Sequence, residues 1–192
     1  MMRMEISKSF YTADRRAWRA WLSKNHKREK EIWLIYYKKS SGKPRIPYND
    51  AVEEALCFGW IDSTVKKRDE ERFAQRFSPR RRTSQLSQMN KERIRKLIAQ
   101  KRMTKEGLDA VAHKFKPEAN HDFFIIPKNI LNAIKENPDA WAHFQMLPKH
   151  YVRIRIAYIK SQGRHSKDAF RRSLSNFIRI TAKGKRFGMV RD

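Results

Sequence analysis

Residues 31–37, Glu-Ile-Trp-Leu-Ile-Tyr-Tyr, predict the central strand of a sheet, around which the other elements can be arranged. Apolar side chains occupy both alternating faces of the stretch, which is the pattern of a strand covered on two sides. A hairpin is predicted between Trp60 and Phe77, where β-branched and aromatic residues surround the polar turn 67–71, and Pro79 ends its second arm. We therefore expect a small sheet built from 31–37 and this hairpin.

Helices are expected on either side of these strands, because apolar residues recur there at helical spacing. Their ranges are 14–25, 49–57, a segment that opens at Thr83 or Ser84, and 104–115. In the second of them, Asn49 is the expected N-cap. The carboxylates of Asp50, Glu53 and Glu54 then lie near the positive end of the helix dipole, which we expect them to stabilise.

The C-terminal part is predicted to be helical throughout. A polar break at 116–122 separates it from the rest, so we expect two domains, 1–116 and 117–192. Apolar stripes at helical spacing predict helices at about 127–136, 138–146, 148–161 and 166–182. Pro127, Pro138 and Pro148 each stand where a helix can begin, a position at which proline is favoured. The predicted fold class is α+β, a small sheet with flanking helices followed by a compact all-helical part.

The charge of the chain points to an anionic partner. Its 45 Lys and Arg residues against 20 Asp and Glu residues give a formal net charge of +25 on 192 residues. Such a surface attracts nucleic acid or an anionic membrane face through its long-range field and through counterion release. A solvated basic surface that only maintains solubility remains the alternative.

Two basic clusters are the candidate contact surfaces for a polyanion. The first comprises Arg80, Arg81, Arg82, Lys91, Arg95 and Lys96. The second comprises Arg164, Lys167, Arg171, Arg172 and Arg179. Both are basic and poor in the Asn and Gln side chains that read base edges, so phosphate contacts are favoured over sequence reading.

A further candidate pocket lies around the predicted hairpin. Trp60 and Asp62 share one face of the first strand, and Arg76 or Arg80 is an expected ionic partner for this carboxylate. The favoured interpretation is a structural brace between the hairpin and the loop before Ser84. The alternative is a small-anion or nucleotide pocket in which Trp60 stacks and Arg80 binds the negative group.

Several blocks of the sequence resemble the YdeI/OmpD-associated family, also described as bacteriocin-protection proteins. They are Trp18-Arg19-Ala20-Trp21-Leu22, Ala55-Leu56-Cys57-Phe58-Gly59-Trp60-Ile61-Asp62, Arg76-Phe77-Ser78-Pro79-Arg80-Arg81 and the C-terminal helices from Pro127 to Arg186. Leu86 stands where that family usually has Trp. The resemblance implies a role in tolerance of cationic antimicrobial peptides and envelope stress, without an established reaction or ligand. A chain at +25 repels a cationic peptide, so any protection would act through an anionic partner or another protein.

Signatures of catalysis are scarce, which favours a binding protein over an enzyme. The six histidines form no His-x-x-x-His pair, and there is no P-loop or Gly-x-Gly-x-x-Gly. Cys57 is the single cysteine and is expected to be a buried, inert thiol, so neither a disulfide nor a Cys-based zinc site is expected. We expect no metal and no cofactor. With no apolar run of about 18 residues and no signal peptide, a cytoplasmic location is expected, and the oligomeric state stays open.

Overall fold

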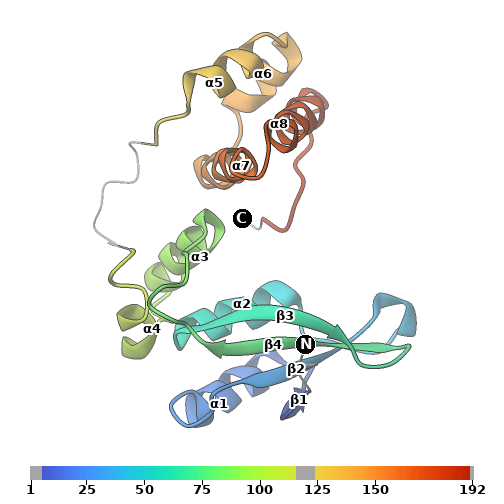
Figure 1. Ribbon diagram of the computed structural model, residues 1–192, viewed down its shortest axis with the longest axis vertical. Coiled ribbons are helices and arrows are strands. Elements are labelled where there is room, and N and C mark those ends of the chain that lie inside the picture. Colours follow the sequence, from blue (N-terminus) through green and yellow to red (C-terminus); the bar gives the residue numbers. More distant parts are fainter. Residues whose placement is uncertain (1–5, 116–123, 191–192) are drawn as a thin grey trace. The chain divides into compact units, whose positions relative to one another are not determined.

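The computed structural model describes residues 6–115 and 124–190, and within them the chain forms two compact units. The first unit comprises 6–86 and 93–115, and the second comprises 87–92 and 124–190. The first is an α+β unit and the second is helical, so the predicted fold class is confirmed (Figure 1). The polar break at 116–122, with the predicted domain boundary, lies outside the described residues. Residues 87–92 group with the second unit, whereas the sequence prediction placed them in the first.

The first unit is built on a sheet in which the described residues form four strands in the order β1-β2-β4-β3. These are β1 (Ser9–Tyr11), β2 (Ile32–Tyr37), β3 (Trp60–Lys67) and β4 (Arg72–Pro79). β2 pairs with β1 in parallel and with β4 in antiparallel, so the predicted central strand and hairpin are confirmed. β1 was not predicted, because three residues are too few to show an alternating pattern.

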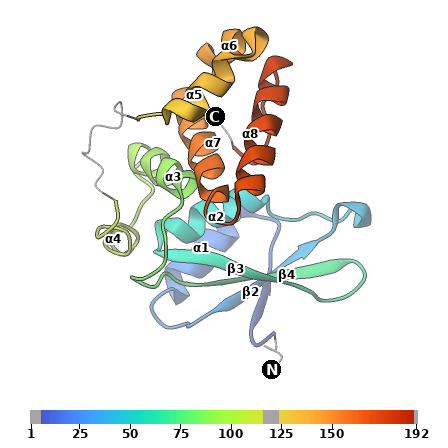
Figure 2. The same ribbon diagram turned by 45° about the horizontal axis from the view of Figure 1, so that its top comes forward.

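Both faces of β2 are buried, which explains why the whole strand is apolar. Ile32, Leu34 and Tyr36 point to the main core, with residues of α1 (Arg15–Asn25) and α2 (Tyr48–Cys57). Figure 2 shows both helices on the same side of the sheet. Trp33 and Ile35 lie on the opposite face in a second, smaller cluster.

Tyr36 carries a hydroxyl that is buried without a hydrogen-bond partner among the described residues. Burial raises the pKa of this phenol. Unfolded tyrosine ionises near pH 10, so the stability linked to Tyr36 is complete below that pH and is lost as pH rises above it. Tyr36→Phe removes the unsatisfied group and keeps the stacked ring contact with Phe73. We expect the variant to be as stable as wild type or about 1 kcal/mol more stable at pH 8.

Urea denaturation at pH 8 and at pH 10.5 checks this prediction. The stability of wild type should fall more between the two pH values than that of Tyr36→Phe. An equal fall in both proteins, or a clear loss of stability in the variant at pH 8, would contradict it.

The starts of two helices differ from the sequence prediction. α2 begins after Pro47 without a side-chain cap, and Asn49 instead accepts a hydrogen bond of 2.6 Å from Arg93. α3 (Gln88–Ala99) begins only after Ser87, whose hydroxyl accepts from the backbone N–H of Asn90 at 3.2 Å. The predicted caps at Asn49 and at Thr83 or Ser84 are therefore wrong.

Contacts with a distant turn explain why the segment before α3 is not helical. The carbonyls of Thr83 and Ser84 accept hydrogen bonds of 3.1 and 3.0 Å from the ammonium group of Lys114. Helix formation at 83–86 would redirect these carbonyls along the helix axis. Residues 110–114 form turns, so α4 (Lys105–Asp109) is much shorter than the predicted helix 104–115.

The acidic side chains of α2 form an ion-pair cluster rather than a first-turn dipole interaction. Glu54 is fully buried and binds Arg15 at 2.5 Å, Arg19 at 2.7 Å and also Arg102. Arg15 also reaches Asp50 at 2.9 Å and Glu53 at 2.8 Å. Only Asp50 lies in the first turn of the helix. The prediction failed for Glu53 and Glu54 because their cationic partners are distant in the sequence.

The second unit contains four helices after residue 124, besides the start of α3. They are α5 (Lys128–Lys135), α6 (Pro138–Gln145), α7 (Lys149–Gln162) and α8 (Lys167–Ala182). They match the predicted ranges within two residues, with Pro127 and Pro148 at N-caps and Pro138 at a first position. Ile134, Ile156 and Phe177 are among the fully buried residues of their shared core. No helix in the part of the chain that the structure describes is both long and apolar enough to cross a bilayer.

Candidate anion-binding site

The pocket predicted around the hairpin is filled by the protein itself. Trp60 is 1% exposed, and its indole N–H donates to the carbonyl of His26 at 3.2 Å. The carboxylate of Asp62 accepts from the hydroxyl of Tyr48 at 2.7 Å and from the amide of Gln75 at 3.3 Å. An indole in the core cannot stack a ligand, so the interpretation in which Trp60 binds one is wrong.

The predicted ion pairs of Asp62 with Arg76 and Arg80 are not formed either. Asp62 lies opposite Phe77 in the sheet, and neighbouring residues of a strand point to opposite faces, so Arg76 points away from Asp62. Arg76 binds Glu31 at 2.6 Å instead. Arg80 is buried and donates to the carbonyl of Gln85 within its own loop. Burial lowers the pKa of this guanidinium, and its Nη1 has no hydrogen-bond partner in the described part of the chain.

The first basic cluster is divided between the two units. Arg80–82, Arg95 and Lys96 belong to the first unit, and Lys91 belongs to the second. Arg81, Arg82 and Lys96 are exposed, whereas Arg95 is half-buried with its guanidinium 5.4 Å from the ring centroid of Phe115. The six residues of this cluster therefore do not all lie in one unit.

The second basic cluster lies on α8 and the loop before it. Its residues Arg164, Lys167, Arg171, Arg172 and Arg179 are all exposed. Arg171 lies 3.5 Å from Asp168, an exposed contact of the kind that contributes little to stability. Arg172 differs from the others because it also lines a pocket.

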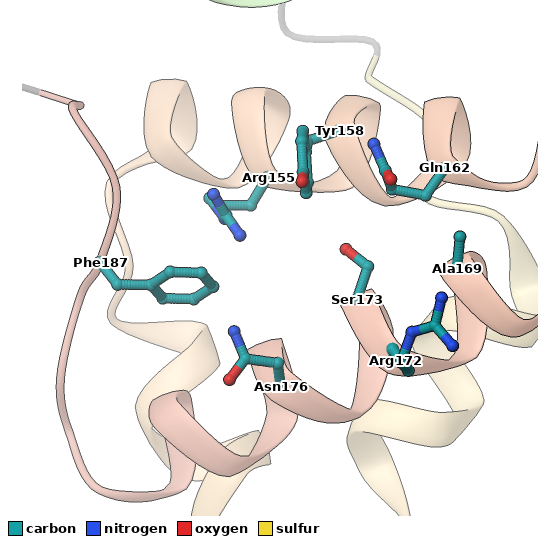
Figure 3. Close-up of a pocket in the computed structure, with 8 residues that line it drawn as sticks. All are labelled: Arg155, Tyr158, Gln162, Ala169, Arg172, Ser173, Asn176 and Phe187. Atoms are coloured by element: carbon teal, nitrogen blue, oxygen red, sulfur yellow. The ribbon is translucent and has the colours of Figure 1, made fainter. Parts of the chain in front are cut away.

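That pocket lies between α7 and α8 and has a volume of about 350 Å³ (Figure 3). Its lining residues are Arg155, Tyr158 and Gln162 of α7, Ala169, Arg172, Ser173 and Asn176 of α8, and Phe187 of the segment after α8. Residues three and four apart share one face of a helix, so the lining residues of each helix lie on the same face. The lining contains two arginines and no carboxylate.

Arg155 is the most unusual of these side chains. It is only 7% exposed, and its guanidinium carbon lies 3.8 Å from the ring centroid of Phe187 and 5.1 Å from that of Tyr158. The rings stabilise the cation but provide no acceptor for its N–H groups. Its Nε has no hydrogen-bond partner among the described residues. Burial lowers the pKa of Arg155, because desolvation disfavours the charged form of the guanidinium.

Two neutral donors of α8 complete the site. The hydroxyl of Ser173 is also buried without a hydrogen-bond partner within 6–115 and 124–190. The carbonyl oxygen of Asn176 accepts from Arg179 at 2.7 Å. An arginine can only donate, so this contact fixes the orientation of the Asn176 amide. Figure 3 shows the amide nitrogen of Asn176 turned toward Arg155. The pocket thus gathers donors and positive charge, the combination that recognises an oxyanion.

The segment after α8 holds Phe187 against Arg155. The hydroxyl of Tyr151 donates to the carbonyl of Phe187 at 3.3 Å and accepts from its N–H at 3.1 Å. Gly188 follows with φ +89°, and a β carbon there would lie 3.3 Å from Nη1 of Arg155. A larger residue at 188 would therefore be strained and would crowd the guanidinium.

Sequence reasoning found one of the residues that line this pocket, Arg172, and missed the others. Arg155 lies between Ile154 and Ile156, so nothing local distinguishes it from a solvated arginine. The signal that could have found the site is polar residues at helical spacing on two consecutive helices. Among the described residues, no three His, Cys, Asp or Glu side chains gather as a metal ion would require.

Comparison with known proteins concerns the N-terminal part of the chain. No curated protein and no solved structure matches the sequence. A family model matches residues 10–110, which excludes every residue of the α7–α8 pocket. The chain belongs to the family of that model, which is described as a domain of unknown function, DUF8412.

Proposed function

We propose that this protein is a non-enzymatic, anion-binding protein that holds a phosphate group in the α7–α8 pocket. The favoured ligand class is a polyanion, with nucleic acid first among polyanions. The observation that carries the proposal is Arg155, a buried arginine whose Nε has no partner within the described residues. An isolated buried cation is unfavourable unless it is paired, and a bound anion would pair it.

The composition of the site supports phosphate as the bound group. Arg155 and Ser173 approach from different helices, and Asn176 adds a third donor. A tetrahedral phosphate has several acceptor oxygens, so it can accept hydrogen bonds from all of these donors at once. Arg172 lines the same pocket and is exposed. It therefore adds positive charge, and its side chain can move to contact the ligand.

The surroundings of the site support a ligand that continues beyond the pocket. Lys167, Arg171 and Arg179 lie exposed on the helix that carries Arg172. A polymer with a phosphate in the pocket would place further phosphates near these cations. The net charge of +25 adds a long-range attraction for such a polymer.

The residues that line the pocket fit a binding site better than a catalytic site. They include no His, Cys, Asp or Glu, so Ser173 has no general base among them. The resemblance to YdeI/OmpD-associated proteins, the cytoplasmic location and a protein partner in the stress response stay predictions. Sequence reasoning placed a small-anion site at Trp60 and Arg80. We propose that the anion binds instead in the α7–α8 pocket of the second unit.

Binding to nucleic acid should depend steeply on salt. We expect the affinity for a fluorescein-labelled single-stranded oligonucleotide, measured by anisotropy, to fall roughly 50-fold between 50 and 200 mM KCl if about four phosphates are contacted. Lys167→Ala with Arg171→Ala should lower the slope of log affinity against log salt by about 1.4. The matched control is Arg16→Ala with Lys24→Ala on α1, which removes the same charge from exposed positions of the first unit.

The control should keep the wild-type slope. Binding that is absent at 50 mM KCl would refute the polyanion proposal. So would an affinity that does not change with salt.

A further inference from the structure

The rim of the α7–α8 pocket carries an aromatic ring that the binding of phosphate does not require. Tyr158 lines the pocket and is 47% exposed, more than any other tyrosine or tryptophan among the described residues. Its hydroxyl is a weak donor beside two arginines, so its ring is the more distinctive feature. An exposed aromatic ring next to a cationic group is the combination that binds unpaired nucleotides, because every base has a π face that can stack.

The position of the ring matches the dimensions of one nucleotide. Tyr158 follows Arg155 by one turn of α7, and such neighbours have β carbons about 5–6 Å apart. The guanidinium of Arg155 lies over the ring of Tyr158, 5.1 Å from its centroid, so a phosphate on the guanidinium would lie near this ring and the base would stack on the face that Arg155 does not cover. In a nucleotide, one ribose separates the phosphate from the base. A ligand with its phosphate on Arg155 can therefore place its base at Tyr158.

The far end of the pocket offers polar groups for the edge of a base. Gln162 follows Tyr158 by one further turn on the same helix and also lines the pocket. Figure 3 shows Arg155, Tyr158 and Gln162 in this order along α7, with Ser173 across from them. An amide has both donors and an acceptor, so it can bind base edges without strict selectivity.

The size of the pocket favours an unpaired nucleotide over a duplex. Its volume of about 350 Å³ is at the lower end for a small-molecule site. Bases in a double helix are covered on both faces by their neighbours, and their removal from the stack is unfavourable. A free nucleotide or a single-stranded end has a base that is already available.

We infer that the α7–α8 pocket binds one nucleoside monophosphate unit, with its phosphate on Arg155 and Ser173 and its base stacked on Tyr158. This inference rests on the proposed function, because it assumes that the bound anion is a phosphate. The unit can belong to a free nucleotide or to single-stranded nucleic acid. Both sources present the same chemistry to the pocket.

Calorimetric titration of the full chain with a graded series of ligands tests the inference. The ligands are AMP, ribose 5-phosphate, which lacks the base, and adenosine, which lacks the phosphate. We expect AMP to bind roughly 5- to 150-fold more tightly than ribose 5-phosphate, the range expected for one stacked base. Adenosine should bind more weakly than AMP, because it makes no contact with Arg155.

Variants of Tyr158 separate the base from the phosphate. Tyr158→Leu should lower the affinity for AMP to that for ribose 5-phosphate and leave the latter unchanged, whereas Tyr158→Phe should keep the preference for AMP. Lys160→Leu, at an exposed position of the same helix outside the pocket, is the control and should bind both ligands as wild type does. A 5′-phosphorylated single-stranded oligonucleotide that binds more tightly than AMP would identify nucleic acid as the source, and equal affinities would identify a free nucleotide.

The possible outcomes distinguish this inference from the proposed function. If wild type binds ribose 5-phosphate as tightly as AMP, the inference is overturned and phosphate binding stands. The same conclusion follows if Tyr158→Leu weakens both ligands equally. If neither phosphate compound binds, the proposed function itself fails at this pocket. The comparison of ligands on wild type needs no variant, so it decides the matter even if Tyr158→Leu does not fold.

Discussion

Arg155→Met is expected to abolish phosphate binding without destabilising the folded protein. The buried guanidinium has an Nε without a partner among the described residues, and such a group lowers stability by about 1–3 kcal/mol. Methionine has a similar length and makes favourable contacts with aromatic rings, so it can pack between Phe187 and Tyr158. The unliganded variant should therefore be as stable as wild type or more stable. This combination of lost binding and kept stability is typical of a residue retained for function.

Thermal unfolding with and without inorganic phosphate measures both effects. Phosphate at about 100 times its dissociation constant should stabilise wild type by about 2.7 kcal/mol and should not shift Arg155→Met. Lys160→Met removes the same charge from an exposed position of α7 and should keep the wild-type shift. A purely structural Arg155 would give the opposite pattern, a marked loss of stability in the variant. Retention of the phosphate shift by Arg155→Met would also refute the assignment.

Glu54→Gln is expected to destabilise the protein more than any of the other substitutions. The carboxylate is 0% exposed and is shared by Arg15, Arg19 and Arg102. Glutamine keeps the shape but carries no charge, so three arginines lose their shared anion. Removing one charged partner of a buried ion pair typically lowers stability by about 3–5 kcal/mol. Arg15 keeps Asp50 and Glu53, which places the expected loss toward the lower end of that range.

Urea denaturation of the variant, monitored by tryptophan fluorescence, checks this expectation. Glu70→Gln is the matched control, because Glu70 binds Lys67 at the surface with 86% of its side chain exposed. The control should change stability by less than about 0.5 kcal/mol. A loss below about 1 kcal/mol for Glu54→Gln would mean that the cluster is a surface network rather than a buried one.

The two predictions differ because the two buried charges have different surroundings. Glu54 has several opposite charges around it, and the protein alone satisfies it. Arg155 has aromatic rings around it and, among the described residues, no carboxylate in contact. A charge that the fold satisfies indicates a structural role. For Arg155, which lines a pocket and has no carboxylate partner in the described part of the chain, we propose that a ligand supplies the missing anion.

The elements that sequence analysis predicted well are those whose pattern is local. The strand 32–37 is apolar at every position, and the helices of the second unit each begin at or next to a proline or a capping serine. Periodicity and capping depend on neighbouring residues, so one sequence is enough to read them. The failures at Asn49 and at Thr83 or Ser84 arose where a distant side chain, Arg93 or Lys114, binds the residue that was expected to cap.

Most of the candidate site could not be predicted from the sequence. The excess of Lys and Arg directed attention to α8, where Arg172 lines the pocket and Arg179 orients Asn176. Whether a given arginine is solvated, paired or buried without a partner is not a property of its neighbours in the chain. Arg76, Arg80 and Arg155 look alike in sequence, yet Arg76 binds Glu31, Arg80 binds a carbonyl of its own loop, and Arg155 faces a pocket.

The order of the amino acids was sufficient to establish the α+β class, the central strand, the hairpin, the C-terminal helices and the strongly basic character of the chain. Only the folded arrangement distinguished the cations that are paired within the protein from Arg155, whose Nε has no partner among the described residues. The difference arises from the range of the interactions. Helix and strand patterns depend on contacts a few residues apart, whereas burial and ion pairing depend on groups that are brought together from distant parts of the chain.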